Sequence, residues 1–414
     1  MLAYSPSHVF FVFVFLFLAL RSFIKIFIHP SSDPEMAMNV PQIVQRWGYP
    51  VEQHEIATED DYILTVFRIP HGINPSGSKR IPIILDHSLL CDSSEYVLNP
   101  PPSSPAMVLA DAGFDVFLMN HRGSAYSRSH RTLNTTDSAY WEFTIDEHAK
   151  YDNPAVIDYV LELTGEESLY WLGHSQGAAL GFTMLADRPE CNNKIRALIA
   201  ITPPGTGYHA RGAYWRTKIL GFTITKPIFD FYRFLLGSHE IAPPFRLPQQ
   251  DFSSHVCVTP YINEICHWTM HIGLGRHAET FNHTRWPVYV SHLPSSTSTW
   301  NFLHWAQIAT RRKLEYFDHN VEENLARYGQ VSPPAYNLSL VEVPVHIFWS
   351  SADWIVTERD IEEDLLPSLR EDVVKGVYHI PGYNHIDFVT ATDNAEKVFH
   401  RVIEIIREQE MAQY

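Results

Sequence analysis

The chain has 414 residues, enough for one large α/β domain with an insertion or for two average domains. Hydrophobic residues at 45% and charged residues at 19% are typical of a globular protein with a sizeable core. A formal net charge of −16 argues against a nucleic-acid partner, which requires a basic face, and the common nucleotide-binding glycine motifs are absent from the sequence. Protonation of the 23 histidines would reverse the sign of the charge, which is compatible with an acidic compartment. The simpler interpretation is that they are ordinary polar residues.

An unbroken apolar run extends from Val9 to Leu20 near the N-terminus. It is short for a membrane span and typical of the apolar centre of a secretory signal. We predict a signal peptide over residues 1–28. An uncleaved anchor is the alternative, because no basic residue precedes the run and no clear cleavage site follows it. Either way the chain is expected to enter the secretory pathway. Three N-x-[ST] sequons agree and predict glycosylation of their asparagines: Asn134, Asn282 and Asn337.

Six short apolar runs predict β-strands. They are Ile81–His87, Asp115–Asn120, Ser168–Gly173, Ile195–Ile201, Val343–Trp349 and Gly376–Gly382. Their apolarity is continuous, which is typical of parallel strands covered on both faces. A helical pattern covers Asp152–Leu163, with Asp152 as the expected N-cap and Pro154 in the first turn. The alternation predicts an α/β fold with a mostly parallel central sheet and helices on both faces.

The alternation stops after the strand that ends at Ile201. The chain is then rich in aromatic residues, prolines and histidines, and no strong strand pattern returns until Val343. We predict a cap or lid inserted over residues 204–341, between two parts of one core formed by residues 29–203 and 342–414. A separate domain is the alternative, but the return of sheet-like segments favours an insertion.

An apolar strand, the pentapeptide Gly173-His174-Ser175-Gln176-Gly177 and a helix of small residues follow one another along the chain. This is the context of a nucleophile elbow, a tight turn that strains the serine backbone while the two glycines leave room around it. The G-x-S-x-G pattern alone arises by chance in roughly one chain in ten of this size, but the flanking strand and helix make chance a poor explanation. We predict that Ser175 is a nucleophile.

A serine hydroxyl needs a base to attack an ester, and the base needs an acid to orient it. In this architecture the acid and then the histidine follow the serine on loops after later strands. Asp353 follows a predicted strand and His385 follows the last one, so we predict both as catalytic. Other acids and histidines fit less well, because they fall on the next helix, too near His385, beside the elbow or in a strand: Asp360, Asp364, Asp387, His174 and His379.

The oxyanion formed during attack needs two backbone N–H donors. One is expected to be the amide of Gln176, directly after the nucleophile. The other should come from the early loop DHSLLCDSS, where Leu89 is the candidate. This chemistry requires no metal and no organic cofactor.

Four cysteines are too few for a disulfide scaffold. Cys257 and Cys266 could close a local loop in an oxidising compartment, whereas Cys91 and Cys191 are expected to be free. A metal site is not expected, because the sequence has no C-x-x-C pair. In addition, the histidine pair at 267 and 271 has Trp268 where a zinc protease needs glutamate.

With these motifs the chain resembles the acid lipases, the gastric and lysosomal triacylglycerol and cholesteryl ester hydrolases of the α/β-hydrolase class. The resemblance starts at PEMAMNVPQIVQRWGYPVEQHEIATEDDYIL, continues through LADAGFDVFLMNHRG, FTIDEHAKYDNPAVIDYV and GHSQG, and closes with YNHIDF. It covers nearly everything after the signal. It implies a triad of Ser175, Asp353 and His385, oxyanion donors at Leu89 and Gln176, and a cap disulfide between Cys257 and Cys266.

Three departures from the family pattern stand out. The family usually has H-G-L-L before the oxyanion donor, whereas this chain has a serine, Ser88, in place of the glycine. Serine is expected to strain the loop or narrow the acyl slot, with an effect on rate more than on reaction type. SSAD replaces a glycine-rich approach to Asp353, and EDD, ending at Asp61, stands where EDG is common.

The sequence thus predicts a secreted or lysosomal ester hydrolase that acts on neutral lipids, triacylglycerols or cholesteryl esters, at a lipid–water interface. A lipid carrier with an impaired hydrolase site is one alternative, although lipid binding does not require a serine, an acid and a histidine in this order. A serine hydrolase of other specificity, such as a thioesterase or peptidase, is another. Dehalogenases and epoxide hydrolases of this fold are excluded, because they need an acidic nucleophile.

Overall fold

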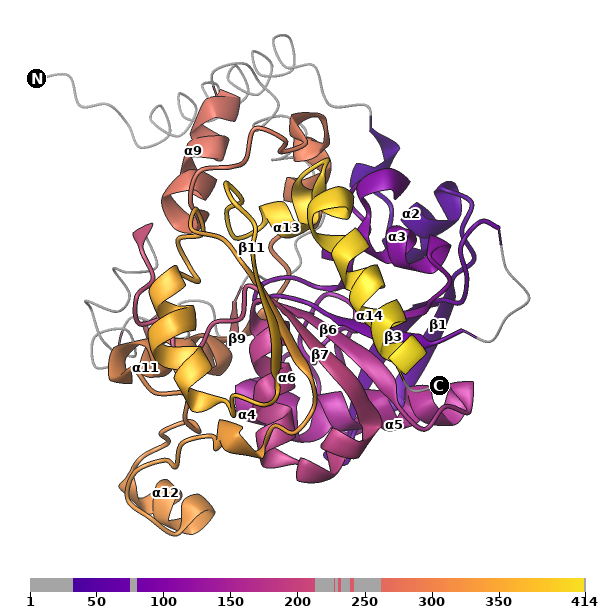
Figure 1. The fold of residues 1–414 in the computed structure, drawn as a ribbon. Helices are drawn as coiled ribbons and strands as arrows, with labels where there is room; N and C mark the ends of the chain where they lie inside the picture. The colour runs from indigo at the N-terminus through magenta and orange to yellow at the C-terminus, as the bar shows by residue number, and fades with distance from the viewer. Residues whose placement is uncertain are drawn as a thin grey trace, which may run out of the picture.

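The structure, a computed structural model, describes residues 33–74, 80–212, 227, 230–231, 239–241 and 262–412. The predicted signal peptide and Cys257 lie outside these residues. Most of the described strands form one nine-stranded sheet in the order β1-β2-β4-β3-β6-β7-β10-β11, with β5 beside β2 (Figure 1). β3, β4, β6, β7, β10 and β11 run parallel, and β1, β2 and β5 pair in antiparallel fashion. The predicted α/β fold is confirmed.

The strands that run parallel correspond to the six predicted runs. The bounds of the sheet strands are β1 (Glu52–Ala57), β2 (Tyr62–Ile69), β3 (Pro82–Asp86), β4 (Asp115–Leu118), β5 (Ser129–His130), β6 (Leu169–His174), β7 (Ile195–Ile201), β10 (Val345–Trp349) and β11 (Val374–His379). The turn between β1 and β2 places Asp61 at φ +71°. This explains why glycine is common at that position, and aspartate is one of the few residues that tolerate this conformation.

Helices cover both faces of the sheet because the side chains of each strand alternate between two apolar clusters. In β3, Ile83 and Leu85 belong to one cluster and Ile84 to the other. The helices of the core are α2 (Val40–Arg46), α3 (Pro105–Asp111) and α14 (His400–Ala412) on the first face, α5 (Asn153–Thr164) and α6 (Gln176–Asp187) on the second, and the short α4 (Ile145–Glu147) and α13 (Asp387–Thr390).

Short helical turns connect these elements. The 3-10 helices are η1 (Pro34–Met36), η2 (Ser93–Tyr96), η3 (Pro101–Ser103), η4 (Ser138–Trp141), η6 (Pro189–Lys194), η7 (His283–Arg285), η8 (Leu338–Leu340) and η10 (Leu366–Ser368), and the π-helical turns are η5 (His148–Asp152), η9 (Asp360–Leu365) and η11 (Ala395–Phe399).

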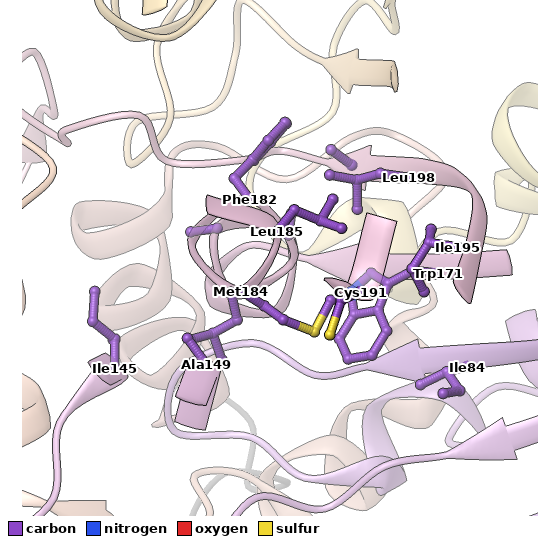
Figure 2. Packing of buried hydrophobic residues seen from close by; sticks show 14 of the residues in the cluster. Ile84, Ile145, Ala149, Trp171, Phe182, Met184, Leu185, Cys191, Ile195 and Leu198 are labelled. Carbon is purple, nitrogen blue, oxygen red and sulfur yellow. The ribbon is translucent and has the colours of Figure 1, made fainter. Parts of the chain in front are cut away.

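The small residues of α6 allow this helix to lie close against the sheet. A Cβ atom added at Gly181 would stand 2.7 Å from Leu198 Cδ1 of β7. The apolar cluster around α6 contains Trp171, Met184 and the free thiol of Cys191 (Figure 2). The helix that carries the candidate nucleophile at its start is therefore fixed by dense packing.

Two local predictions were wrong. Asp152 does not cap a helix: the helical backbone begins earlier, after Thr144, and reaches α5 through the π-helical turn η5. Asp152 is a buried acceptor for Arg122 and His148 instead, so an ion pair outweighed its capping tendency. The last strand, β11, is not covered on both faces, because it lies at the sheet edge with alternate residues exposed.

The segment between β7 and β10 contributes helices and a two-stranded ribbon in its described parts. Its elements are β8 (Glu240–Ile241), α9 (Ile262–Leu274), α10 (Trp286–His292), β9 (Thr297–Ser298), α11 (Thr299–Arg311) and α12 (Val321–Tyr328). α12 projects away from the body (Figure 1). Among the described helices, none combines the length and apolarity needed to cross a bilayer. The cap boundaries remain a prediction.

Candidate active site

Ser175 occupies a strained turn between β6 and α6. Its backbone has φ +53° and ψ −115°, outside the regions that serine normally adopts. A Cβ atom at Gly173 would lie 2.4 Å from the Ala178 amide nitrogen, and one at Gly177 would lie 2.3 Å from the Asp86 carbonyl oxygen. Both glycines are therefore required by close backbone approach, as the elbow motif predicts.

Gly177→Ala is expected to lower the free energy of unfolding by about 3 kcal/mol or more, because the methyl group would overlap backbone that cannot move away. Gly273→Ala is the matched control, since a Cβ atom at this helical glycine meets nothing within 4 Å. The control should stay within about 1 kcal/mol of the wild type. Denaturant unfolding of both variants measures the difference, and equal stabilities would contradict the packing argument.

The three side chains predicted as a triad lie in one chain of hydrogen bonds. His385 Nε2 lies 2.7 Å from Ser175 Oγ, and His385 Nδ1 lies 2.7 Å from Asp353 Oδ2. All three residues are buried. Because the carboxylate can only accept, Nδ1 carries a proton and Nε2 is left to accept one from the serine hydroxyl. This arrangement suits nucleophilic attack by Ser175 on a carbonyl group.

Asp353 is held in place by the loop that follows β10. Its Oδ1 atom accepts from the amides of Ile355 and Val356 at 2.7 and 3.0 Å, which leaves Oδ2 for His385. The competing acids are used elsewhere. Asp360 accepts from Thr357 and from the His209 amide. Asp364 pairs with Arg312, and Asp387 accepts from the amides of Ala278 and Asn384. None of the three carboxylates is hydrogen-bonded to the imidazole of His385.

The loop that contains the predicted oxyanion donor Leu89 forms a tight turn. The amide of Cys91 donates to the carbonyl of Ser88 at 3.1 Å, and Leu90 has φ +60°. The prediction of backbone strain at Ser88 is wrong, because the left-handed conformation occurs two residues later, at Leu90. Within the described chain, neither the Leu89 amide nor the Gln176 amide donates to another protein group. Both remain free for an oxyanion.

An apolar cavity of about 380 Å³ opens in front of Ser175 and His385. One wall of the cavity comes from the oxyanion loop and the elbow. The other wall comes from α9, α10, α11 and the segments beside them, through Met270, Leu274, Trp286, Tyr289, Val290, Leu293, Pro294, Phe302 and Trp305. The volume falls in the range of small-molecule sites, and the lining favours an apolar ligand group beside the reactive serine.

Helix α11 also holds the residue after the nucleophile. Trp305 Nε1 donates to Gln176 Oε1 at 2.7 Å, and Asn301 Nδ2 donates to the same oxygen at 3.2 Å. All three side chains are buried. Neither residue was predicted from the sequence, although the i,i+4 spacing of Asn301 and Trp305 in WNFLHWAQ is a signal that they share one helix face.

A buried charged network lies beneath the oxyanion loop. The His121 amide donates to His87 Nε2 at 3.1 Å, and His121 Nε2 donates to Asp86 Oδ1 at 2.5 Å. Burial by itself lowers the pKa of His121, but the carboxylates of Asp86 and Asp152 outweigh it and raise the pKa to about 9. His121 is therefore a cation between two carboxylates at neutral pH.

His121→Gln should destabilise the fold most at acidic and neutral pH. The folded-state pKa of about 9 exceeds the ordinary value of 6.5, so the stabilisation is complete below pH 6.5 and disappears as the pH rises through 9. The difference in unfolding free energy should be roughly 3 kcal/mol at pH 6 and shrink towards pH 10. Thermal unfolding across this range checks it, with the exposed histidine variant His400→Gln as control. A gap that widens with pH would contradict the charge assignment.

One group of described side chains has the spacing of metal ligands. His121, His148 and Asp152 bring ligand atoms within 4.8 Å of one another. However, Arg122 donates to Asp152 Oδ1 at 2.8 Å through Nε and at 2.6 Å through Nη2. A guanidinium that already neutralises the carboxylate fits a structural ion-pair network better than a metal site.

The remaining predicted positions are the cysteines and the sequon asparagines. Cys91 and Cys191 are free, as expected. Cys266 is disulfide-bonded, and Cys257, the partner that the family resemblance implies, lies outside the described residues. The sequon asparagines lie in irregular segments or directly before short helical turns. Asn134 and Asn337 are exposed, and Asn282 is half-buried. Their glycosylation remains a prediction.

Comparison with known proteins identifies the family. Residues 40–100 match the family model "partial alpha/beta-hydrolase lipase region", and residues 90–392 match "alpha/beta hydrolase fold". The chain is 36% identical to lipase lipl-1 of Caenorhabditis elegans over 383 residues, which cover 91% of this chain and 93% of that protein. It is 34% identical to human gastric triacylglycerol lipase over 386 residues, covering 92% and 94% of the two chains. The chain belongs to the lipase family of α/β-hydrolases.

The resemblance inferred from the motifs is thereby confirmed, and this lipase-family protein is an ester hydrolase by fold and relationship. Solved structures support the fold alone. A putative lipase from Sulfolobus solfataricus superposes with a TM-score of 0.53 at 13% identity and covers 86% of this chain and 99% of its own. A putative lipase from Acinetobacter baumannii gives 0.52 at 11% identity, covering 92% and 99%.

Proposed function

We propose that the protein is a lipase that hydrolyses the carboxylic esters of neutral lipids through an acyl-enzyme on Ser175. The single observation that carries this proposal is the hydrogen-bonded series Ser175, His385 and Asp353 at the wall of an apolar cavity. A reactive serine beside an apolar cavity suits an ester with a long acyl chain. The relation to gastric triacylglycerol lipase points to triacylglycerols as the first substrate to test.

In the proposed reaction, Ser175 Oγ attacks the ester carbonyl while His385 Nε2 takes the hydroxyl proton. The carbonyl oxygen becomes an oxyanion, which the amides of Leu89 and Gln176 stabilise. His385 then gives its proton to the leaving alcohol, and Asp353 stabilises the imidazolium in the meantime. A water molecule, activated by the same histidine, releases the fatty acid and restores the serine. We infer that residues 204–341 act as a cap which shields the acyl chain from water.

The proposed place of action is the lysosome or the extracellular space, and the pKa shifts of three buried groups indicate the pH range in which the fold is most stable. Burial raises the pKa of Asp146 to about 7, so this group stabilises the fold below its ordinary value of 3.8 and loses that contribution as the pH rises through 7. Burial also lowers the pKa of His304 to about 4, so stability falls in the opposite direction, as the pH drops below 6.5 towards 4. Together with the raised pKa of His121, these shifts make the fold more stable at weakly acidic pH than at alkaline pH.

If the protein acts in an acidic compartment, the purified protein is expected to release fatty acid from an emulsified triacylglycerol faster at about pH 5.5 than at about pH 7.5. The measurement is titrated fatty acid, with a cholesteryl ester, an acyl thioester and a peptide substrate in parallel. Preference for the thioester or the peptide would assign a different specificity. Binding of fatty acid without turnover of any ester would replace the lipase with a lipid carrier.

A further inference from the structure

Glu95 is a buried carboxylate that the proposed reaction does not use. It lies on η2 (Ser93–Tyr96), which is fixed to the sheet because the hydroxyl of Tyr96 donates to the Asp86 carbonyl at 2.6 Å. Glu95 is only 3% exposed. A carboxylate that is removed from water must be matched by protein donors, so its partners indicate its role.

Ser88 supplies two of these donors. Its amide donates to Glu95 Oε1 at 3.1 Å, and its hydroxyl donates to Oε2 at 2.6 Å. Both groups belong to the residue directly before Leu89, the predicted oxyanion donor. The serine that departs from the family pattern thus provides an anchor that glycine does not have. Its hydroxyl fixes the oxyanion loop to η2.

His174 is the third partner of Glu95. Its Nδ1 atom lies 3.5 Å from Glu95 Oε1, an ion-pair distance that is long for a hydrogen bond. Its Nε2 atom lies 2.9 Å from the backbone carbonyl oxygen of His385. Because a carbonyl group only accepts, Nε2 must carry a proton. The side chain beside the nucleophile therefore supports the backbone of the candidate catalytic histidine.

The charges of this pair agree with the geometry. Burial by itself lowers the pKa of His174, but attraction by Glu95 outweighs it and raises the pKa above its ordinary value. Burial by itself raises the pKa of Glu95, but attraction by His174 and His87 outweighs it and lowers the pKa. Glu95 is thus an anion between the two donors of Ser88 and the imidazole of His174.

We propose that Glu95 is a positioning residue that joins the two halves of the active site, an inference that rests on the proposed serine-hydrolase function. On one side it sets the direction of the Leu89 amide through Ser88. On the other side it sets the backbone of His385, and thereby the imidazole, through His174. Both effects act on charge that develops during the reaction, so they should influence turnover more than substrate binding.

Glu95→Gln tests this role because glutamine has the same size but presents an amide group to donors. On a soluble short-chain ester, kcat is expected to fall about 10- to 100-fold while KM stays within about threefold of the wild type. Glu35→Gln is the matched control: Glu35 is also buried and ion-paired, but its partners are Arg46 and Arg285 instead of active-site residues. The control should lower the unfolding temperature and leave kcat unchanged.

Ser88→Gly provides a second test that does not alter the buried charge. We expect kcat to fall about 3- to 10-fold, and to fall no further when Ser88→Gly is added to Glu95→Gln, because both substitutions act on the same contact. If Glu95→Gln does not fold, Ser88→Gly decides alone. A Ser88→Gly enzyme as fast as the wild type would overturn the proposal.

A third outcome separates this inference from the proposed function. If Glu95→Gln keeps kcat within about twofold of the wild type while Ser175→Ala is inactive, the positioning role is wrong and the serine mechanism stands. If Ser175→Ala retains turnover, the proposed function itself is wrong, whatever Glu95 does.

Discussion

Ser175→Ala is expected to lower kcat for ester hydrolysis by about 10⁴- to 10⁶-fold while the protein folds normally. The hydroxyl is the only nucleophile in hydrogen-bond contact with His385 Nε2 among the described residues, at 2.7 Å. Alanine adds no atom to the strained turn, so the elbow can keep its shape. Fatty-acid release from an emulsion and from a soluble ester measures the effect, and residual rate would come from the oxyanion donors and the cavity.

Ser168→Ala is the matched control for this prediction. Ser168 directly precedes β6, at the opposite end of the strand from Ser175, and its hydroxyl accepts from Arg196 Nε at 3.0 Å. Its substitution should leave kcat unchanged. Turnover that survives Ser175→Ala at more than about one hundredth of the wild-type rate would remove Ser175 as the nucleophile.

Asp353→Asn is expected to lower kcat by about 10⁴-fold with little change in fold. Asparagine Oδ1 can keep the bonds from the Ile355 and Val356 amides, which places the new NH₂ group against His385 Nδ1. Nδ1 must then accept, so the proton moves to Nε2, which faces the serine. The imidazole would no longer act as a base towards Ser175. The rate should be measured on a soluble ester, so that surface binding does not contribute.

Asp360→Asn is the control that separates the two acids. Asp360 is also buried and lies seven residues further along the chain, but it accepts from Thr357 and from the His209 amide rather than from an imidazole. We expect lower stability and a kcat within about threefold of the wild type. A larger kcat loss in Asp360→Asn than in Asp353→Asn would reassign the acid.

The local sequence was sufficient to predict the six parallel strands and the elbow, because both depend on short-range patterns. Continuous apolar runs mark the buried parallel strands, and the two glycines around Ser175 answer a steric requirement of one turn. Chain order then placed Asp353 and His385 after β10 and β11. The antiparallel strands β1, β2 and β5 were not predicted. β1 has no apolar run, because most of its residues are polar and exposed, and β5 has only two residues. β2 does have an apolar run, YILTVFRI, which was a signal that could have been used.

Long-range polar contacts could not be predicted in the same way. Asp152 has the residue type of an N-cap, but Arg122, thirty residues away, converts it into a buried ion-pair partner. Likewise, nothing in the loop around Ser88 indicates that its hydroxyl donates to Glu95, and nothing in the sequence around Trp305 indicates that α11 reaches Gln176. Such contacts depend on which segments the fold brings together, and a single sequence carries little information on that pairing.

The hydrogen bonds from α11 to Gln176 have a practical consequence for enzyme engineering. Asn301 and Trp305 both donate to the side chain of the residue whose amide is a predicted oxyanion donor. A chimera in which the segment between β7 and β10 comes from another hydrolase would lack both donors, and the Gln176 side chain would then be free to rotate. An engineered exchange of the segments that line the cavity should therefore transfer α11 and the elbow together.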